Sequence, residues 1–279
     1  MLNLDFILQN ALKEDLGDGD HTTLATVPEN VTGQAHLIIK DYGILAGISV
    51  IQRLYQLFDP SLKLNIFLND GAEIKPNDIA FTVSGKARSI LQTERLALNI
   101  LQRMSGIATS TRKFVDKIKD TNAIILDTRK TSPCLRLLEK MAVKIGGGQN
   151  HRFGLYDMIL IKDNHIDFAG GIKPAITNTV NYLKKHNLNL KIEIEVRNFN
   201  ELEQVLQTGN IHRIMLDNFT PEQVKKAVQI INHKYETEAS GGITLENIRN
   251  YALTGVDFIS VGALTHQIHS LDMSLKKQF

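Results

Sequence analysis

The second half of the chain repeats one pattern: a short apolar run, polar residues at its end, and then a segment with apolar residues at helical spacing. Such units predict parallel β-strands connected by helices, with functional side chains at the carboxyl ends of the strands. Helices are expected near residues 172–186, 200–207, 221–233 and 245–253. The polar strand ends are Asp127–Lys130, Lys162–His165, Glu195, Asp217-Asn218, Ser240–Gly242 and Gly262.

These units predict an α/β fold, specifically an incomplete (β/α) barrel, because fewer than the eight strands of a closed barrel are recognisable. A doubly wound open sheet is the alternative. Its first strand is normally followed by a glycine-rich dinucleotide turn, and here Asp127-Thr128-Arg129 follows instead. The pattern therefore favours the barrel.

The first half of the chain has a different pattern of apolar and polar residues. An amphipathic helix is expected over residues 3–14, short strands broken by turns over 33–85, and a long helix over 91–119. This pattern predicts an N-terminal α+β sandwich-like domain of residues 1–110. The α/β barrel domain would then span residues 111–266, with the C-terminal tail 267–279 packing on the first domain.

Composition narrows the class of protein. The 279 residues carry a net charge of +2, contain no Trp, and show no basic run interleaved with aromatic residues, so nucleic-acid binding is not expected. The only cysteine is Cys134, which excludes an intrachain disulfide and favours a reducing compartment. Neither a secretory leader nor an apolar run of ~20 residues is found, so we expect a cytoplasmic protein without membrane contact.

Cationic residues gather at two strand ends and in the glycine loop between them. Because these segments should meet at one edge of the sheet, they predict a site for a substrate with several negative charges. The residues are Arg129, Lys130, His151, Arg152 and Lys162. In contrast, Arg136, Lys140 and Lys144 lie four apart on one predicted helix, and we expect them to form a solvated face.

Carboxylates end two other strands. Glu193 and Glu195 alternate in KIEIEV and are expected on opposite faces, with Glu195 the better site candidate; Asp217 ends the next strand. Spacing alone leaves two interpretations open, namely salt-bridge partners for Lys162 or Arg129, or a Mg²⁺-phosphate site. Two glycine-containing loops favour the second, because they follow the last two strands, where barrels usually bind phosphate. These loops are Ser240-Gly241-Gly242 and Val261-Gly262-Ala263.

The residues alone do not name a reaction, since the chain lacks a Walker loop, a nucleophile elbow and zinc-ligand spacing. Nearly the whole chain, however, resembles the quinolinate phosphoribosyltransferase family. The matching segments are EDLGDGDHTT (14–23), ERLALN (94–99), SGIAT (105–109), DTRKT (127–131), GGGQNHRFGLYD (146–157), LIKDNH (160–165), EIEV (193–196), LDNF (216–219), EASGGI (238–243) and VGALTH (261–266). A molybdenum-linked family shares the TRK and GGG-x-x-HR elements, but LIKDNH is similar to the quinolinate enzymes. One departure is Cys134, where the family usually has Gly.

The resemblance implies transfer of the phosphoribosyl group from phosphoribosyl diphosphate to quinolinate with decarboxylation, giving nicotinate mononucleotide in NAD biosynthesis. It implies catalytic roles for Lys130, Glu195 and Asp217, of which Glu195 and Asp217 would hold Mg²⁺. The residues implied for the two quinolinate carboxylates are Arg95, Arg129, His151, Arg152 and Lys162. Those implied around phosphoribosyl diphosphate are Thr128, Lys130, Glu195, Asp217, Ser240, Gly241, Gly242, Val261, Gly262, Ala263 and His266.

The family also implies a homodimer, possibly a higher oligomer, with shared active sites. The helical segment ERLALN precedes the barrel strands, so Arg95 would complete the quinolinate site of the neighbouring subunit. Two alternatives remain. A nicotinate-type phosphoribosyltransferase would need fewer cations, because its substrate has one carboxylate, and a non-catalytic barrel would bind a phosphorylated ligand without turnover.

Overall fold

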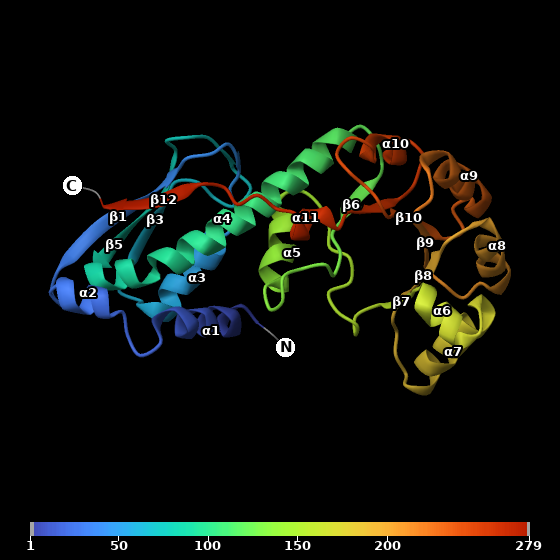
Figure 1. Cartoon of the computed structure of the whole chain (residues 1–279), viewed down its shortest axis with the longest axis horizontal. Coiled ribbons are helices and arrows are strands. Elements are labelled where there is room, and N and C mark those ends of the chain that lie inside the picture. Colours follow the sequence, from blue (N-terminus) through green and yellow to red (C-terminus); the bar gives the residue numbers. More distant parts are fainter. Residues whose placement is uncertain (1–2, 278–279) are drawn as a thin grey trace. The chain divides into compact units, whose positions relative to one another are not determined.

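The computed structural model describes residues 3–277 and divides the chain into two compact units (Figure 1). Unit 1 consists of Met1–Arg112, Thr131–Gly147 and Leu264–Phe279, as far as these segments are described. Unit 2 consists of Lys113–Lys130 and Gly148–Ala263. The predicted N-terminal domain and C-terminal tail include residues 1, 2, 278 and 279, which lie outside the described residues.

Unit 1 is built on an antiparallel sheet with the strand order β12-β1-β5-β3. Its strands are β1 (Thr32–Ile39), β3 (Lys63–Ile66), β5 (Ile79–Lys86) and β12 (Met273–Lys277), and a separate ribbon pairs β2 (Gly43–Ile44) with β4 (Glu73–Ile74). The C-terminal strand β12 pairs with β1, with Leu37 opposite Leu275. The alternating burial along β1 is typical of a sheet with one face on a core.

The helices of unit 1 precede, connect and follow these strands. They are α1 (Leu4–Leu16), α2 (His21–Thr26), α3 (Ile48–Phe58), the first part of α4 (Ala87–Ile118) as far as Arg112, and α5 (Arg136–Ile145). The N-terminus of α3 is held by Asp70, whose carboxylate accepts the backbone N–H groups of Gly47 and Ile48 at 2.6 and 2.8 Å.

The turn before α5 contains Cys134, which is exposed and has a left-handed backbone with φ of 64°. Lys140 was expected in solvent but its side chain is buried, because α5 is covered on more than one face. Glu139 is buried as well and pairs with Arg103 of α4.

Unit 2 contains a parallel sheet that, within residues 3–277, has six strands in the order β6-β11-β10-β9-β8-β7. The strands are β6 (Ile124–Leu126), β7 (Ile159–Ile161), β8 (Ile192–Val196), β9 (Arg213–Asp217), β10 (Glu236–Ser240) and β11 (Phe258–Ser260). From β7 to β11 each strand lies beside the next in sequence, so the order never reverses as it does in a doubly wound sheet. The predicted incomplete barrel is therefore confirmed.

The connecting helices pack against one another in chain order, as Figure 1 shows at its right-hand side. They are α6 (Asp163–Ala169), α7 (Ile172–Lys185), α8 (Phe199–Thr208), α9 (Pro221–Ile231) and α10 (Ile248–Ala252), followed by the short α11 (Ala263–His266), at whose start unit 2 ends. Right-handed crossovers that always advance in one direction place such helices on one face of the sheet and leave the other face as the barrel interior.

The segment after the glycine loop continues the sheet beyond β6. Gln149 forms a parallel bridge with Leu126, and the N–H of Asp127 donates to the carbonyl of Gln149 at 3.1 Å. The chain then reaches His151 directly beside the carboxyl end of β6. Among the helices of residues 3–277, none combines the length and the apolar character that a membrane span requires.

Candidate active site

The parallel register brings the predicted strand ends to one edge of the unit 2 sheet. Asp217 lies opposite Ser240, and Ser260 lies opposite Leu126, so polar residues that follow these strands are neighbours. The residues collected at this edge are Thr128, Arg129, Lys130, Lys162, Glu195, Asp217, Ser240, Gly241, Gly242, Val261, Gly262 and Ala263. Arg95 and His266 belong to unit 1, where Arg95 lies on α4 and His266 ends α11; both are exposed.

Glu195 and Asp217 form the acidic part of this edge. The ammonium group of Lys162 lies 3.2 Å from Glu195 Oε2. Burial raises the pKa of Glu195, which the charge of Lys162 opposes and that of Asp217 reinforces. Burial likewise raises the pKa of Asp217, against the lowering influence of Lys162. Two partly desolvated carboxylates on neighbouring strands therefore share one cation and have capacity for another.

The loop after β10 offers backbone groups. Gly241 and Gly242 have φ of 91° and 61°, in the left-handed region that favours glycine, and a Cβ on Gly241 would collide with the side chain of Asn218. Asn218 itself donates its backbone N–H to the carbonyl of Ser240 at 2.8 Å. The loop is thus held close to Asp217, as a phosphate-binding turn requires.

Arg129 and Arg152 form the basic part of the site. Arg152 is buried, and its guanidinium donates to the carbonyl of Met158 at 3.2 Å. Burial lowers the pKa of Arg152, and the neighbouring charge of Arg129 lowers it further. The Nε of Arg129 is buried and has no hydrogen-bond partner among the described residues. Two convergent guanidinium groups, one with an unused buried donor, provide a site for an anion.

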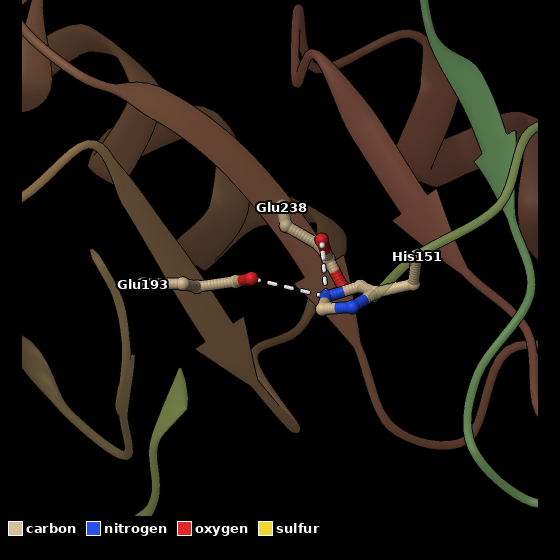
Figure 2. A group of neighbouring side chains, drawn as sticks. All are labelled: His151, Glu193 and Glu238. Atoms are coloured by element: carbon tan, nitrogen blue, oxygen red, sulfur yellow. Dashed lines mark ion pairs between the residues drawn. The ribbon is translucent and has the colours of Figure 1, made fainter. Parts of the chain in front are cut away.

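His151 points into the interior of the barrel and faces two buried carboxylates (Figure 2). Its Nε2 lies 3.0 Å from Glu193 Oε2 and 3.4 Å from Glu238 Oε2. Arg213 of β9 donates from its Nη1 to Glu238 Oε2 at 3.0 Å. We call His151, Glu193, Arg213 and Glu238 the buried tetrad.

Sequence reasoning missed three members of the tetrad. The expectation that Glu193 and Glu195 point to opposite faces is wrong, because residues two apart on a strand share a face, and both carboxylates lie on the interior side. A signal was present in the charged residues that share one parity along each strand, namely Glu193 and Glu195 in KIEIEV, Arg213 and Asp217 in RIMLD, and Glu236 and Glu238 in ETEAS. Interior positions of a barrel are usually filled by branched apolar residues, so this alternation indicates a polar interior.

The remaining predicted residues have modest contacts. Thr128 accepts the backbone N–H of Lys130 on its hydroxyl oxygen at 3.0 Å, and Lys130 is exposed. The N–H of Val261 donates to the carbonyl of Leu126 at 3.0 Å, which fixes the loop after β11 beside β6. A cavity of about 380 Å³ lies beside β7, lined by Arg152, Met158 and residues of α6 and α7.

Two family descriptions match this chain. The quinolinate phosphoribosyl transferase N-terminal domain matches residues 20–105, and the C-terminal domain of the same enzymes matches residues 107–276. Among curated proteins, "Quinolinate phosphoribosyltransferase [decarboxylating] 1b" of Nicotiana tabacum is 44% identical over 98% of this chain and 82% of its own length. The "Probable nicotinate-nucleotide pyrophosphorylase [carboxylating]" of Bacillus subtilis is 40% identical over 98% of this chain and 93% of its own.

Solved structures agree with these matches. The crystal structure of NadC from Streptococcus pyogenes superposes with a TM-score of 0.92 at 36% identity, covering 100% of this chain and 99% of that one. The nicotinate-nucleotide pyrophosphorylase from Francisella tularensis superposes with a TM-score of 0.90 at 39% identity, covering 100% and 98%. Fold and sequence thus point to the same group of proteins.

Proposed function

This chain belongs to the quinolinate phosphoribosyltransferase family, and we propose that its unit 2 site transfers a phosphoribosyl group from phosphoribosyl diphosphate to quinolinate. The products are nicotinate mononucleotide, diphosphate and CO₂. Relatives of the chain carry names for this decarboxylating reaction of NAD biosynthesis. The chain is accordingly an enzyme, a phosphoribosyltransferase.

The observation that carries this assignment is the pair Arg129 and Arg152. Burial and the charge of Arg129 both lower the pKa of Arg152, so an anion bound beside these two guanidinium groups would stabilise their charged forms. The buried Nε of Arg129 supplies a donor that no described residue uses. A planar dicarboxylate such as quinolinate satisfies both groups, with Lys162 available for its second carboxylate. This supports the two-carboxylate substrate over one with a single carboxylate.

The reaction needs positioning rather than a covalent nucleophile. The pyridine nitrogen of quinolinate forms a bond to the first carbon of the ribose, and the bond from that carbon to the diphosphate oxygen breaks. Glu195 and Asp217 face the positive charge that develops on the ribose, while Lys130 and the Ser240–Gly242 loop bind the phosphates. Loss of CO₂ then leaves an electron pair on the ring carbon beside the positive nitrogen, and that carbon takes a proton.

Mg²⁺ fits the acidic part of the site. Glu195 and Asp217 supply two oxygen ligands, and Mg²⁺ prefers one or two carboxylates together with water and substrate phosphate oxygens. Burial raises the pKa of both carboxylates, and a bound cation would stabilise their charged forms. When bound, the ion would neutralise the diphosphate as it leaves. Lys162 contacts Glu195 and would hold its side chain in place both with and without the ion.

We further propose that the enzyme is a homodimer whose Arg95 serves the site of the second copy. Arg95 is exposed on α4 and makes no hydrogen bond or ion pair with residues 3–277. The cations for quinolinate on unit 2 would then be completed by one from a partner. His266, also exposed, stays a predicted phosphate ligand, and the cytoplasmic location and any higher oligomer stay predictions as well.

The assignment of the basic part is tested by Arg152→Ala, with Arg249→Ala as the matched control. Arg249 is an exposed arginine of the same unit that pairs with Asp120 at 2.8 Å. Losing one partner of a desolvated ion pair costs about 2–5 kcal/mol, so Arg152→Ala should raise the KM for quinolinate strongly and that for phosphoribosyl diphosphate little. Equal increases for both substrates would show that the two parts of the site are assigned incorrectly.

A further inference from the structure

Both ring nitrogens of His151 are occupied within the protein. Nδ1 accepts the backbone N–H of Arg152 at 2.7 Å, and Nε2 lies between the carboxylates of Glu193 and Glu238. The side chain of His151 is 6% exposed. The ring therefore connects two interior carboxylates to the backbone of Arg152.

The hydrogen bonding of the ring determines which of its nitrogens carries the proton. Because Nδ1 accepts an N–H, it must keep its lone pair, and the ring proton lies on Nε2 between the two carboxylates. Burial lowers the pKa of His151, whereas Glu193 and Glu238 raise it, to about 9 overall. A second proton would have to bind Nδ1 and would break its hydrogen bond from the Arg152 N–H, so the ring that keeps this bond carries one proton. Burial and the charge of Glu238 raise the pKa of Glu193 to about 7. Arg213 compensates the charge of Glu238.

The same hydrogen bond argues against a metal ion among these three side chains. His151, Glu193 and Glu238 bring one possible ligand atom each within 4.8 Å of one another, as a metal site would. A metal-bound histidine donates a proton from its other nitrogen, and here that nitrogen accepts one. A proton on Nε2 occupies the position that a metal would need, so the tetrad is a site for protons.

The tetrad connects rigid strands to a loop of the active site. Glu193 and Glu238 lie on β8 and β10, on either side of β9 with Arg213. On the opposite side, the backbone N–H of His151 donates to Asp127 Oδ1 at 2.9 Å, directly after β6. The amide of Arg152 therefore donates to a ring that carboxylates of β8 and β10 contact, and the backbone of the same histidine is held at the end of β6.

An interior of this kind is costly to maintain. Charged groups lose hydration when buried, and a buried ionic network is often no more stable than apolar residues of the same volume. Branched apolar side chains fill this position in most barrels. The tetrad does not maximise stability, and it includes His151, the residue directly before Arg152. A role in positioning Arg152 therefore explains it better.

We propose that Glu193 and Glu238 are positioning residues for quinolinate: they orient His151 so that its Nδ1 fixes the backbone of Arg152 and thereby the guanidinium at the basic part of the site. This inference rests on the proposed function, because it takes quinolinate as the ligand of Arg152. It gives His151 a role through the backbone of Arg152, in addition to the direct contact implied by the family resemblance.

The test compares two substitutions of similar size. Glu193→Gln keeps an oxygen that can accept the Nε2 proton, whereas Glu193→Leu removes it. Glu201→Gln and Glu201→Leu are the matched controls, because Glu201 is a buried carboxylate on α8 of unit 2 that pairs with Arg197, just before that helix. We expect Glu193→Leu to raise the KM for quinolinate at least tenfold and the KM for phosphoribosyl diphosphate less than twofold. Glu193→Gln should keep the quinolinate KM within threefold of wild type.

A second measurement observes the ring of His151 in the wild-type protein and uses a variant only to assign its signal. In ¹⁵N-histidine-labelled wild-type protein, the ring of His151, identified from the spectrum of His151→Gln, should be neutral with its proton on Nε2 and slow to exchange. A proton on Nδ1, or an unchanged quinolinate KM in a folded Glu193→Leu, would overturn the inference. Wild-type protein that shows this ring state but never turns over quinolinate would instead reject the proposed function.

Discussion

The Nε2 of His151 lies 3.0 Å from Glu193 Oε2, and this pair spans the interior of a sheet that does not close. His151 belongs to the segment beside β6, at one end of the strand order, and Glu193 lies on β8 near the other end. A closed barrel joins its first and last strands by backbone hydrogen bonds. In this chain a side-chain contact links the two sides across the interior, directly below the edge where the predicted substrate residues gather.

The shared-site dimer predicts complementation between inactive variants. Arg95→Ala and Arg152→Ala should each be nearly inactive alone. After subunits exchange to equilibrium, about half of the dimers are mixed, and each mixed dimer keeps one intact site, so activity should return to roughly a quarter of wild type. Each variant incubated with itself is the control. If labelling confirms exchange and no activity returns, Arg95 acts in its own subunit.

Metal removal tests the acidic part of the site. Chelation by EDTA should abolish turnover, and added Mg²⁺ should restore it, because Glu195 and Asp217 provide the ligands. Glu195→Gln and Asp217→Asn should each raise the Mg²⁺ concentration needed for half-maximal activity, by an estimated tenfold or more for the loss of one carboxylate ligand. Turnover that is unaffected by EDTA would show that the assignment of a metal to these carboxylates is wrong.

The backbone at Cys134 predicts a stabilising substitution. A residue with a Cβ pays about 1–2 kcal/mol in the left-handed region, whereas glycine adopts φ of 64° freely but loses more chain entropy on folding. Cys134→Gly should therefore increase the free energy of unfolding by about 0.5–1 kcal/mol. Cys134→Val, with a branched Cβ, should decrease it. Urea denaturation followed by circular dichroism measures both, and a less stable glycine variant would contradict the explanation.

The ion pair of Asp120 and Arg249 predicts a specific dependence of stability on pH. The hydrogen bond from Arg249 lowers the pKa of Asp120 to about 2. A carboxylate with a lowered pKa contributes stability above its unfolded-state pKa, and this contribution is lost as the pH falls through the folded value. Asp120→Asn should thus lower the unfolding temperature slightly at pH 6, with a smaller effect at each step from pH 4 toward pH 2. Arg249→Gln, which removes the partner of Asp120, should abolish the same dependence on pH.

Local patterns along the chain were sufficient to predict the strand ends. Apolar runs that stop at a charged residue mark where a buried parallel strand leaves the core, and this identified Arg129, Lys162, Glu195 and Asp217 at one edge. The order from β7 to β11 also follows from sequence, because consecutive βα units of one hand add strands in one direction, whereas the pairing of β6 with β11 does not follow from this rule.

Contacts across the barrel interior could not be predicted in the same way. The pairing of His151 with Glu193 depends on the register of strands far apart in sequence. It also depends on where the segment after the glycine loop pairs with β6. Side-chain parity along β8 would have placed Glu193 inside with Glu195, but its partners come from β10 and from the loop. The left-handed backbone of Cys134 is similarly a property of the turn before α5, not of any periodic pattern.

The central claim is that this chain decarboxylates quinolinate only as it transfers a phosphoribosyl group. The most direct measurement follows quinolinate labelled with ¹³C in its 2-carboxylate, incubated with the enzyme and Mg²⁺, with and without phosphoribosyl diphosphate. We predict labelled CO₂ and unlabelled nicotinate mononucleotide in equal amounts, and neither product when phosphoribosyl diphosphate is omitted. Binding of quinolinate without labelled CO₂ in the complete mixture would contradict the account and indicate a barrel that binds its ligand without catalysis.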